Sequence, residues 1–234
     1  MSDERSLRKQ IAEIARICWE RGTIGAIDGN VSVRLDDGDL LVTPSGGIKF
    51  LIDPDQVVRC APDGTPRTGG RASTEIRMHV TCYQERPDVK AVVHAHPPTA
   101  VAFSIAGLDS LMKPVIPELV ATLGAIPTAP YGTPGTDELP ESIRTLIRCS
   151  DAVLMERHGA VCVGADLLDA YKKLEQIEHN AKILYMAHTL GGVRPMPAED
   201  VTRLLGTREG LGIETNNVYC NHCGMPPGMT PNDL

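Results

Sequence analysis

Aromatic side chains are scarce in this 234-residue sequence, since Phe, Trp and Tyr together make up only 3% of it. Proteins that bind single-stranded nucleic acid stack bases on such side chains, so we do not expect a surface of that kind. Excess positive charge is missing as well, because the formal net charge is −7. A broad surface that follows a phosphate backbone is therefore not expected, although a local pocket can still attract a small anion. We predict no nucleic-acid partner.

Long hydrophobic runs are also missing, and no segment approaches the roughly 20 apolar residues that cross a bilayer. The first five residues are polar or charged apart from Met1, and an amphipathic pattern follows them directly, which is unlike a signal peptide. We therefore expect no membrane partner and a cytoplasmic location. The seven cysteines are odd in number and scattered through apolar segments. This pattern favours reduced thiols, several of them packed as small core residues, over a disulfide framework.

Helical and extended patterns alternate along the sequence without a clear linker until its last part. Apolar residues recur at helical spacing over residues 7–18, and Gly22 lies where that helix would end. Residues 31–43 have the pattern of a strand, a turn and a second strand. With 42% hydrophobic residues, the sequence can bury a substantial core. We predict one α/β domain over residues 1–215 and a mobile tail over residues 216–234, which are rich in Pro, Gly and Asn.

The other elements are predicted from apolar spacing and from residues that begin or end helices. Ser73 is expected to cap a helix from Thr74 to about Gln84, and Pro97 to lie in the first turn of the next helix. Because helices interleave with hairpins, we predict a mixed sheet with helices on both faces. Further strands are expected at 57–60, 91–94, near Val115, 125–126, 152–155 and 160–163, and further helices at 137–149 and 166–190.

The tripeptide His94-Ala95-His96 follows an apolar run, residues 91–93. Side chains alternate across a strand, so two imidazoles one residue apart at a strand end point the same way. Two nitrogen ligands on one face make half of a metal site. A single histidine in such a position is more often an ordinary buried residue, whereas the pair, with a third histidine downstream, favours metal binding.

His158 is the third imidazole, and Glu75 is a carboxylate upstream of the pair. His158 follows a second apolar strand and would reach the same end of the sheet if the two strands run in the same direction. Three neutral imidazoles suit Zn²⁺, with Co²⁺ or Mn²⁺ as substitutes. A carboxylate beside such a cation can serve as a general base, because a polarised carbonyl has a more acidic neighbouring C–H. The ordinary alternative for Glu75 is a favourable interaction with the start of its helix.

Three short segments are small, rich in hydrogen-bond donors and located at expected loops or a helix start: residues 29–30, 45–46 and 73–74. Backbone N–H groups at such places, with hydroxyls beside them, bind phosphate without lysines. Each segment alone is more common in an ordinary turn. Ser73 and Thr74 are the stronger candidates, because they put an anion site and the Glu75 carboxylate within one helical turn.

Five spaced motifs occur in order along the sequence: Gly29-Asn30-Val31-Ser32-Val33-Arg34, Thr43-Pro44-Ser45-Gly46, Ser73-Thr74-Glu75, His94-Ala95-His96-Pro97 and His158-Gly159. Together they resemble the class II aldolase/adducin family, and within it most closely the aldolases that act on L-fuculose 1-phosphate. The resemblance covers residues 7–190 and implies a three-layer α/β/α fold with a mixed, mostly antiparallel central sheet. It also implies a homotetramer with sites at subunit interfaces.

The resemblance further implies a zinc-dependent, reversible cleavage of a ketose 1-phosphate to dihydroxyacetone phosphate and an aldehyde. A small phosphorylated sugar is then the expected partner. By motif, Glu75 is the acid/base that exchanges a proton with C3 of dihydroxyacetone phosphate. The implied metal ligands are His94, His96 and His158, and the implied phosphate-binding residues are Asn30, Ser45, Gly46, Ser73 and Thr74.

Other reactions of the same superfamily stay open at this point. The sugar-phosphate epimerases generally have Asp at the position of Glu75, so this sequence departs from their pattern. Decarboxylases and dehydratases share the metal scaffold, and the residues that select the last step lie in variable loops. A non-catalytic adducin-like binding domain would lack the metal ligands, whereas all three histidines are present here.

Two tyrosines and a cysteine cluster are weaker candidates. Tyr131 lies on a loop rich in Gly and Pro, residues 130–135, and is a candidate catalytic residue that would face the aldehyde portion of the substrate, from the same or a neighbouring subunit. The resemblance includes a C-terminal tyrosine that closes over a neighbour's site, for which Tyr219 is the candidate. The cluster Cys220-Asn221-His222-Cys223 holds only three close ligands, without the two paired sets of a zinc ribbon, and favours a loose tail.

Overall fold

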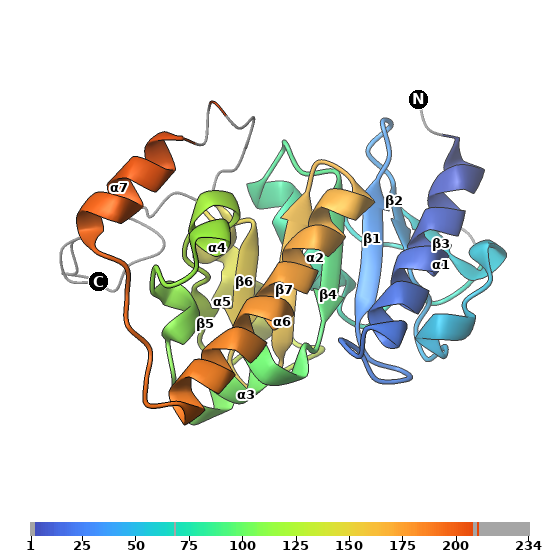
Figure 1. Cartoon of the computed structure of the whole chain (residues 1–234). Helices are drawn as coiled ribbons and strands as arrows, with labels where there is room; N and C mark the ends of the chain where they lie inside the picture. Colours follow the sequence, from blue (N-terminus) through green and yellow to red (C-terminus); the bar gives the residue numbers. More distant parts are fainter. Residues whose placement is uncertain (1–2, 68, 208–209, 211–234) are drawn as a thin grey trace.

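The computed structural model describes residues 3–67, 69–207 and 210 (Figure 1). Its strands are short and mostly buried, and its helices are amphipathic or buried. In chain order the elements are α1 (Glu4–Glu20), β1 (Asn30–Arg34), β2 (Leu40–Val42), β3 (Val58–Cys60), α2 (Ile76–Glu85), β4 (Ala91–Ala95), α3 (Pro98–Ala106), α4 (Pro117–Thr122), β5 (Thr128–Ala129), α5 (Glu138–Ile147), β6 (Ala152–Met155), β7 (Gly159–Gly164), α6 (Leu167–Thr189) and α7 (Ala198–Gly206).

The described strands form one sheet in the order β3-β2-β1-β4-β7-β6-β5. Neighbouring strands are antiparallel except for β5 and β6, which are parallel. Because β4 and β6 both pair antiparallel with β7, they run in the same direction and end at the same end of the sheet. We call this the site end: here β4 leads into α3, and β6 leads into residues 156–158. Because β4 and β6 run in the same direction, His158 reaches the same end of the sheet as His94 and His96.

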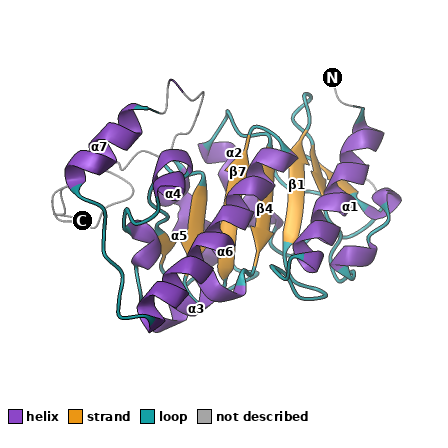
Figure 2. Cartoon of the chain, in the orientation of Figure 1, coloured by secondary structure: helices purple, strands orange, loops and turns teal. Residues whose placement is uncertain are grey.

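Helices cover both faces of the sheet, so that the fold has three layers, as the resemblance implies (Figure 2). One face packs against α1, α3 and α6, and the other packs against α2 and α5. Side chains of β4 alternate between the two faces: Val93 packs in the core under α1, α3 and α6, and Val92 packs in the core under α2 and α5. The predicted fold class, a mixed and mostly antiparallel sheet between helical layers, is confirmed.

The helices expected at 137–149 and 166–190 are confirmed to within a few residues, but α2 begins later than predicted. The Ser73 hydroxyl accepts a hydrogen bond from the Glu75 main-chain N–H (3.3 Å), and Ile76 N–H donates to the Ser73 carbonyl (3.1 Å). Residues 73–75 therefore close a turn of their own. As a result Glu75 is the residue that precedes the first helical turn, not a member of it.

The strands expected near Val115 and at 125–126 are wrong. Val115 lies just before α4, which has a proline at its first position, and Ile126 donates its N–H to the Leu111 carbonyl instead of to a strand. Burial explains the apolar run, because Ile126 lies in the core that faces α1 and α6. The strand of this region is β5, two residues further on, and α7 was not anticipated.

Four cysteines, Cys18, Cys60, Cys82 and Cys162, are free and buried, in agreement with their expected role as small core residues. Cys149 is disulfide-bonded, so the expectation of reduced thiols is wrong at this position. Among the helices that the structure describes, none is both long and apolar enough to span a bilayer. The proposed tail (216–234), with Tyr219 and the cluster at 220–223, lies outside the described residues.

Candidate metal centre and phosphate site

His94 and His96 come from the end of β4 and the residue that follows it. His94 is buried on the face of β4 that carries Val92, and the His96 N–H donates to the Thr23 carbonyl (2.9 Å), which holds the chain in an extended path beyond the strand. The Nε2 atoms of the two rings are 3.0 Å apart. The expected convergence of alternate side chains is therefore present.

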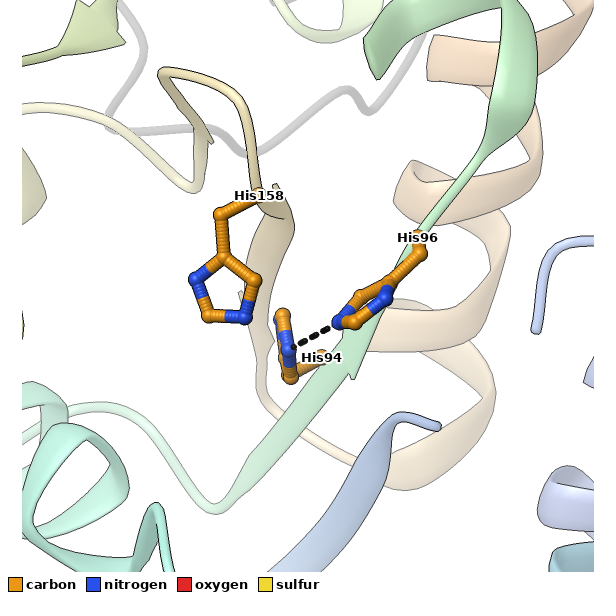
Figure 3. Close-up of side chains that lie close together, drawn as sticks. All are labelled: His94, His96 and His158. Atoms are coloured by element: carbon orange, nitrogen blue, oxygen red, sulfur yellow. Dashed lines mark hydrogen bonds between the residues drawn. The ribbon is translucent and has the colours of Figure 1, made fainter. Parts of the chain in front are cut away.

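His158 reaches the same point from the tight connection between β6 and β7. The preceding residue, Arg157, has a φ of 59°, the one positive φ at a non-glycine residue in the part of the chain that the structure describes. The following residue, Gly159, has no room for a side chain, since a Cβ there would lie 2.8 Å from the His96 ring and 2.9 Å from the His94 ring. Figure 3 shows the three rings turned toward one another, and each pair of ring centres is 4.9 Å apart.

The donor set fits a divalent transition metal. One ligand nitrogen from each ring lies within 4.8 Å of the others, and tetrahedral zinc with Zn–N bonds of about 2.0–2.1 Å needs nitrogens roughly 3.3 Å apart. His94 Nδ1 donates to the Ala160 carbonyl (2.9 Å), which directs the lone pair of Nε2 toward the centre. Burial, followed by repulsion from the other two histidines, lowers the pKa of His96 to about 3 and keeps it neutral, as a ligand must be.

Glu75 lies directly against this cluster. Its Oε2 atom is 3.3 Å from His94 Nε2, and its Oε1 atom is 3.1 Å from His158 Nε2. The Asn30 side-chain amide donates to Oε2 (2.7 Å). Burial by itself raises the pKa of Glu75, but hydrogen bonds and attraction from His158 and His94 outweigh it and hold the pKa well below its usual value. The structure therefore places a carboxylate directly against the histidine cluster.

The loop at 45–46 and the turn at 73–74 lie side by side. Ser45 N–H donates to the Arg71 carbonyl (2.8 Å), and Ser73 N–H donates to the Thr43 carbonyl (3.1 Å). Ser73 is buried, whereas Gly46 and Thr74 are exposed, and Gly46 adopts a φ of 73° that favours glycine. Four of the five predicted phosphate residues are thus neighbours at the start of α2. The fifth, Asn30, is turned toward Glu75.

Lys49 is a buried cation that the sequence interpretation did not single out. It is only 4% exposed, and its ammonium donates to the Gly47 carbonyl (3.1 Å) in the same loop as Ser45. It borders a small cavity together with Asn30 and His94. Burial lowers the pKa of Lys49, and the negative charges of Asp28 and Glu75 oppose this effect. Its position next to the apolar Ile48 and Phe50 is the one sequence signal that could have indicated burial.

Tyr131 follows β5 and therefore lies at the site end as well. The residue is 54% exposed, and its hydroxyl makes no hydrogen bond to any residue that the structure describes, while its main-chain N–H donates to Glu156 (3.3 Å). No contact joins this hydroxyl to the three histidines among the described residues, and the catalytic role of Tyr131 stays a prediction.

Behind Glu75 lie three further buried polar side chains that were not anticipated: Ser32 on β1, and His79 and Tyr83 on α2. The signal that could have found them is spacing. Positions 75, 79 and 83 recur every four residues, and helical residues four apart share a face.

Comparison with known proteins identifies the fold's relatives. Residues 9–185 match the family model described as Class II Aldolase and Adducin N-terminal domain. The chain is 34% identical to 3-oxo-tetronate 4-phosphate decarboxylase of Escherichia coli strain K12 over 186 residues, 78% of this chain and 88% of that protein. It is 35% identical to L-fuculose phosphate aldolase of Escherichia coli O6:H1 over 187 residues, 79% of this chain and 82% of that protein. The solved structure of YgbL from Escherichia coli is similar with a TM-score of 0.81 and 32% identity, covering 86% of this chain and 99% of that one.

Proposed function

This chain belongs to the class II aldolase and adducin family, and from that premise we propose that it is a metal-dependent lyase that breaks a carbon–carbon bond near a carbonyl group of a phosphorylated sugar derivative. The observation that carries the proposal is the Glu75 carboxylate, 3.3 Å and 3.1 Å from two of three converging histidines. His94, His96 and His158 would hold the cation, and three imidazoles favour zinc. A cation held there would polarise a carbonyl group of the substrate and stabilise the negative charge that develops on its oxygen.

The substrates named for the two relatives contain a common half. Loss of CO₂ from a 3-oxo-tetronate 4-phosphate leaves dihydroxyacetone phosphate. Aldol cleavage of a ketose 1-phosphate between C3 and C4 also leaves dihydroxyacetone phosphate. In both reactions the carbon beside the carbonyl is left with negative charge and must receive a proton. The same protein groups can therefore serve both reactions, and only the departing half differs.

In this proposal Glu75 carries the proton. It delivers a proton to that carbon during cleavage and removes it in the reverse direction, a role that typically contributes about 10²- to 10⁴-fold to the rate. The donors at 45–46 and 73–74 hold the phosphate, and Lys49 supplies the nearest buried positive charge. Anchoring the phosphate fixes the reacting carbon in reach of the carboxylate.

Two departing halves are candidates. Aldehyde loss is the first, because the motifs around Glu75 and the histidines predict an aldolase that acts on a ketose 1-phosphate. Loss of CO₂ is the second, and the 34% identity to a decarboxylase over 88% of that protein favours it. The same proposal includes that the protein is a homotetramer in the cytoplasm. It also includes that Tyr131 approaches the site of a neighbouring subunit.

Proton exchange tests the proposal independently of the departing half. Metal-loaded protein is incubated with dihydroxyacetone phosphate in D₂O, and the C3 hydrogens are followed by NMR. We expect one C3 hydrogen to exchange in the wild type. Glu75→Gln is expected to keep its metal and to exchange at least about 100-fold more slowly than the wild type. Absence of exchange by the metal-loaded wild type would contradict the proposed function, and undiminished exchange by the variant would remove Glu75 from its role.

A coupled assay then separates the two candidates. Release of dihydroxyacetone phosphate is measured with a panel of ketose 1-phosphates and with a 3-oxo-tetronate 4-phosphate. Aldehyde formation identifies the aldolase, whereas CO₂ formation identifies the decarboxylase.

A further inference from the structure

A continuous line of buried hydrogen bonds joins α2 to β1 behind the site. It passes from Glu75 to Asn30, then to His79, Ser32 and Tyr83, and so alternates between the helix and the strand. The distances are 2.7 Å from Asn30 to Glu75, 2.6 Å from Ser32 to His79 and 2.8 Å from Ser32 to Tyr83. We call these five side chains the polar ladder. Four of them are buried, and His79 is 0% exposed.

The polar ladder forms because two periodicities nearly coincide. Its helical members are four residues apart, which corresponds to about 6.0 Å along a helix. Its strand members, Asn30 and Ser32, are two residues apart, which corresponds to about 6.6 Å along a strand. A helix packed along a strand can therefore place the two sets in alternation. The neighbouring positions of this layer are apolar, with Met78 of α2 and Val92 of β4 in the same core.

The donor directions along the polar ladder follow from hydrogen-bond chemistry. The Asn30 NH₂ group donates to Glu75 Oε2 (2.7 Å), so that its carbonyl oxygen faces His79 and can only accept. His79 Nε2 must then carry a hydrogen. Burial, followed by repulsion from His94, lowers the pKa of His79 to about 3, so the ring is neutral and Nδ1 is an acceptor. The Ser32 hydroxyl donates to Nδ1, and its oxygen accepts from the Tyr83 hydroxyl.

We propose that His79, held by Ser32 and Tyr83, is a positioning residue that locks the Asn30 amide and through it the Glu75 carboxylate. This inference rests on the proposed function, since Glu75 matters as the group that moves a proton. A free Asn30 amide could turn by 180° and present its oxygen to the carboxylate. The His79 Nε2–H prevents this, because a turned amide would set two donors against each other.

The tautomer of His79 can be measured in the wild-type protein. Seven histidines are present, and ¹⁵N-histidine labelling gives ring signals that distinguish Nε2–H from Nδ1–H. The His79 signals are assigned from their disappearance in His79→Gln. We expect the neutral Nε2–H form from pH 6 to pH 8 in the metal-loaded protein. A neutral Nδ1–H form, or a charged ring at pH 7, would overturn the donor directions and the proposal with them.

Two amide variants separate positioning from packing. His79→Gln can retain a donor where Nε2 lies, whereas His79→Asn reaches only as far as Nδ1. We expect His79→Asn to lower kcat for proton exchange about threefold to tenfold, the effect of one lost hydrogen bond between uncharged groups, with metal content unchanged and KM within about twofold. His79→Gln is expected to recover most of that loss. Met78→Leu is a conservative change of a neighbouring buried residue and should retain wild-type exchange.

Equal losses in both amide variants would overturn the proposal, as would an increase in KM without a change in kcat, which would assign the polar ladder to phosphate binding. If the amide variants do not fold, Ser32→Ala removes the donor to Nδ1 and is expected to lower kcat in the same way, and wild-type kcat in this variant would overturn the proposal. Exchange by the wild type distinguishes these outcomes from failure of the proposed function, because that function fails only if the unmodified protein does not exchange.

Discussion

The two ends of the sheet each bury charged side chains, and they treat them in opposite ways. At the end opposite the site, Asp151 precedes β6 and accepts hydrogen bonds from Arg86 (2.9 Å) and from Lys173 (3.0 Å). Lys173 also donates to the Val163 carbonyl (3.0 Å) and to Asp169 (2.9 Å). At the site end, the buried Lys49 donates to a main-chain carbonyl, and Glu75 contacts the imidazoles of His94 and His158.

The pKa values of the two buried lysines differ between the two ends of the sheet. Burial alone lowers the pKa of both, but attraction to Asp151 and Asp169 more than compensates at Lys173, whose pKa is raised. The pKa of Lys49 stays lowered, since Asp28 and Glu75 do not make up for its burial. His158 Nδ1 is also buried without a hydrogen-bond partner among the residues that the structure describes. The opposite end therefore compensates the burial of its lysine, whereas the site end leaves the burial of Lys49 uncompensated, where an anionic substrate can pair with it.

The largest expected effect is at the histidine cluster. His94→Ala removes a ligand, and we expect the bound metal to fall from about one per subunit to a small fraction and proton exchange to fall at least about 10³-fold. Metal analysis and the exchange assay measure these losses. His179→Ala changes an exposed histidine of α6 and should alter neither. Full metal content in His94→Ala would contradict the assigned ligand set.

The next effect is on stability at the opposite end. Asp151→Ala leaves Arg86 and Lys173 without their shared carboxylate, and we expect a loss of about 3–5 kcal/mol in the free energy of unfolding, measured by urea denaturation. The kcat of the folded fraction should not change. Asp137→Ala removes an exposed partner of Arg77 and is expected to cost less than about 1 kcal/mol. Similar losses in the two variants would show that burial does not distinguish the pairs.

The lysines are expected to respond to substitution with opposite signs. At pH 7 Lys173→Met should lower the Tm and Lys49→Met should raise it, because only Lys49 has a folded-state pKa below the unfolded value. The stabilisation by Lys173 is present below its unfolded pKa of about 10.4 and is lost as the pH rises through its higher folded value. The destabilisation by Lys49 is present below its folded pKa and disappears as the pH rises to the unfolded value. Thermal melts from pH 7 to pH 11 measure both trends, and a Tm shift of the same sign in both variants would contradict the comparison.

The smallest expected effect is at the phosphate site. Ser73→Ala removes one hydroxyl donor, and we expect KM for phosphorylated substrate to rise about five- to tenfold with little change in kcat, because one hydrogen bond to a charged group is lost. Kinetics with phosphorylated and unphosphorylated forms of the same substrate check this. An equal loss with the unphosphorylated form would remove Ser73 from phosphate binding.

Much of the fold could be predicted where the signal is local. The amphipathic period of α1 and the long helical pattern of α6 are visible in any window of the sequence, and both elements are present. The prediction failed where burial and not strand pairing causes an apolar run, as at Ile126, because a buried loop and a strand have the same composition. It also misplaced the start of α2, since Ser73 can either cap a helix or close a turn before it.

The candidate site also contains residues that local sequence could predict and residues that it could not. The pair His94 and His96 could be predicted because alternation acts over two residues. His158 could be predicted only conditionally, since its approach depends on how β4, β7 and β6 pair across the sheet. Lys49 and the His79 contact with Asn30 could not be predicted, because burial of a lysine and packing of a helix along a strand are properties of the whole fold.

The sequence by itself determined the chemical groups and their local directions: two imidazoles on one side of a strand end, a carboxylate at a helix start and small donor-rich loops. Only the tertiary structure decided that the third imidazole meets the other two, and that Glu75 is held from behind by Asn30 and His79. The physical reason is range. Backbone geometry acts over a few residues, whereas strand pairing and helix packing can bring together residues as far apart in the sequence as Asn30 and Glu75, which are 45 residues apart.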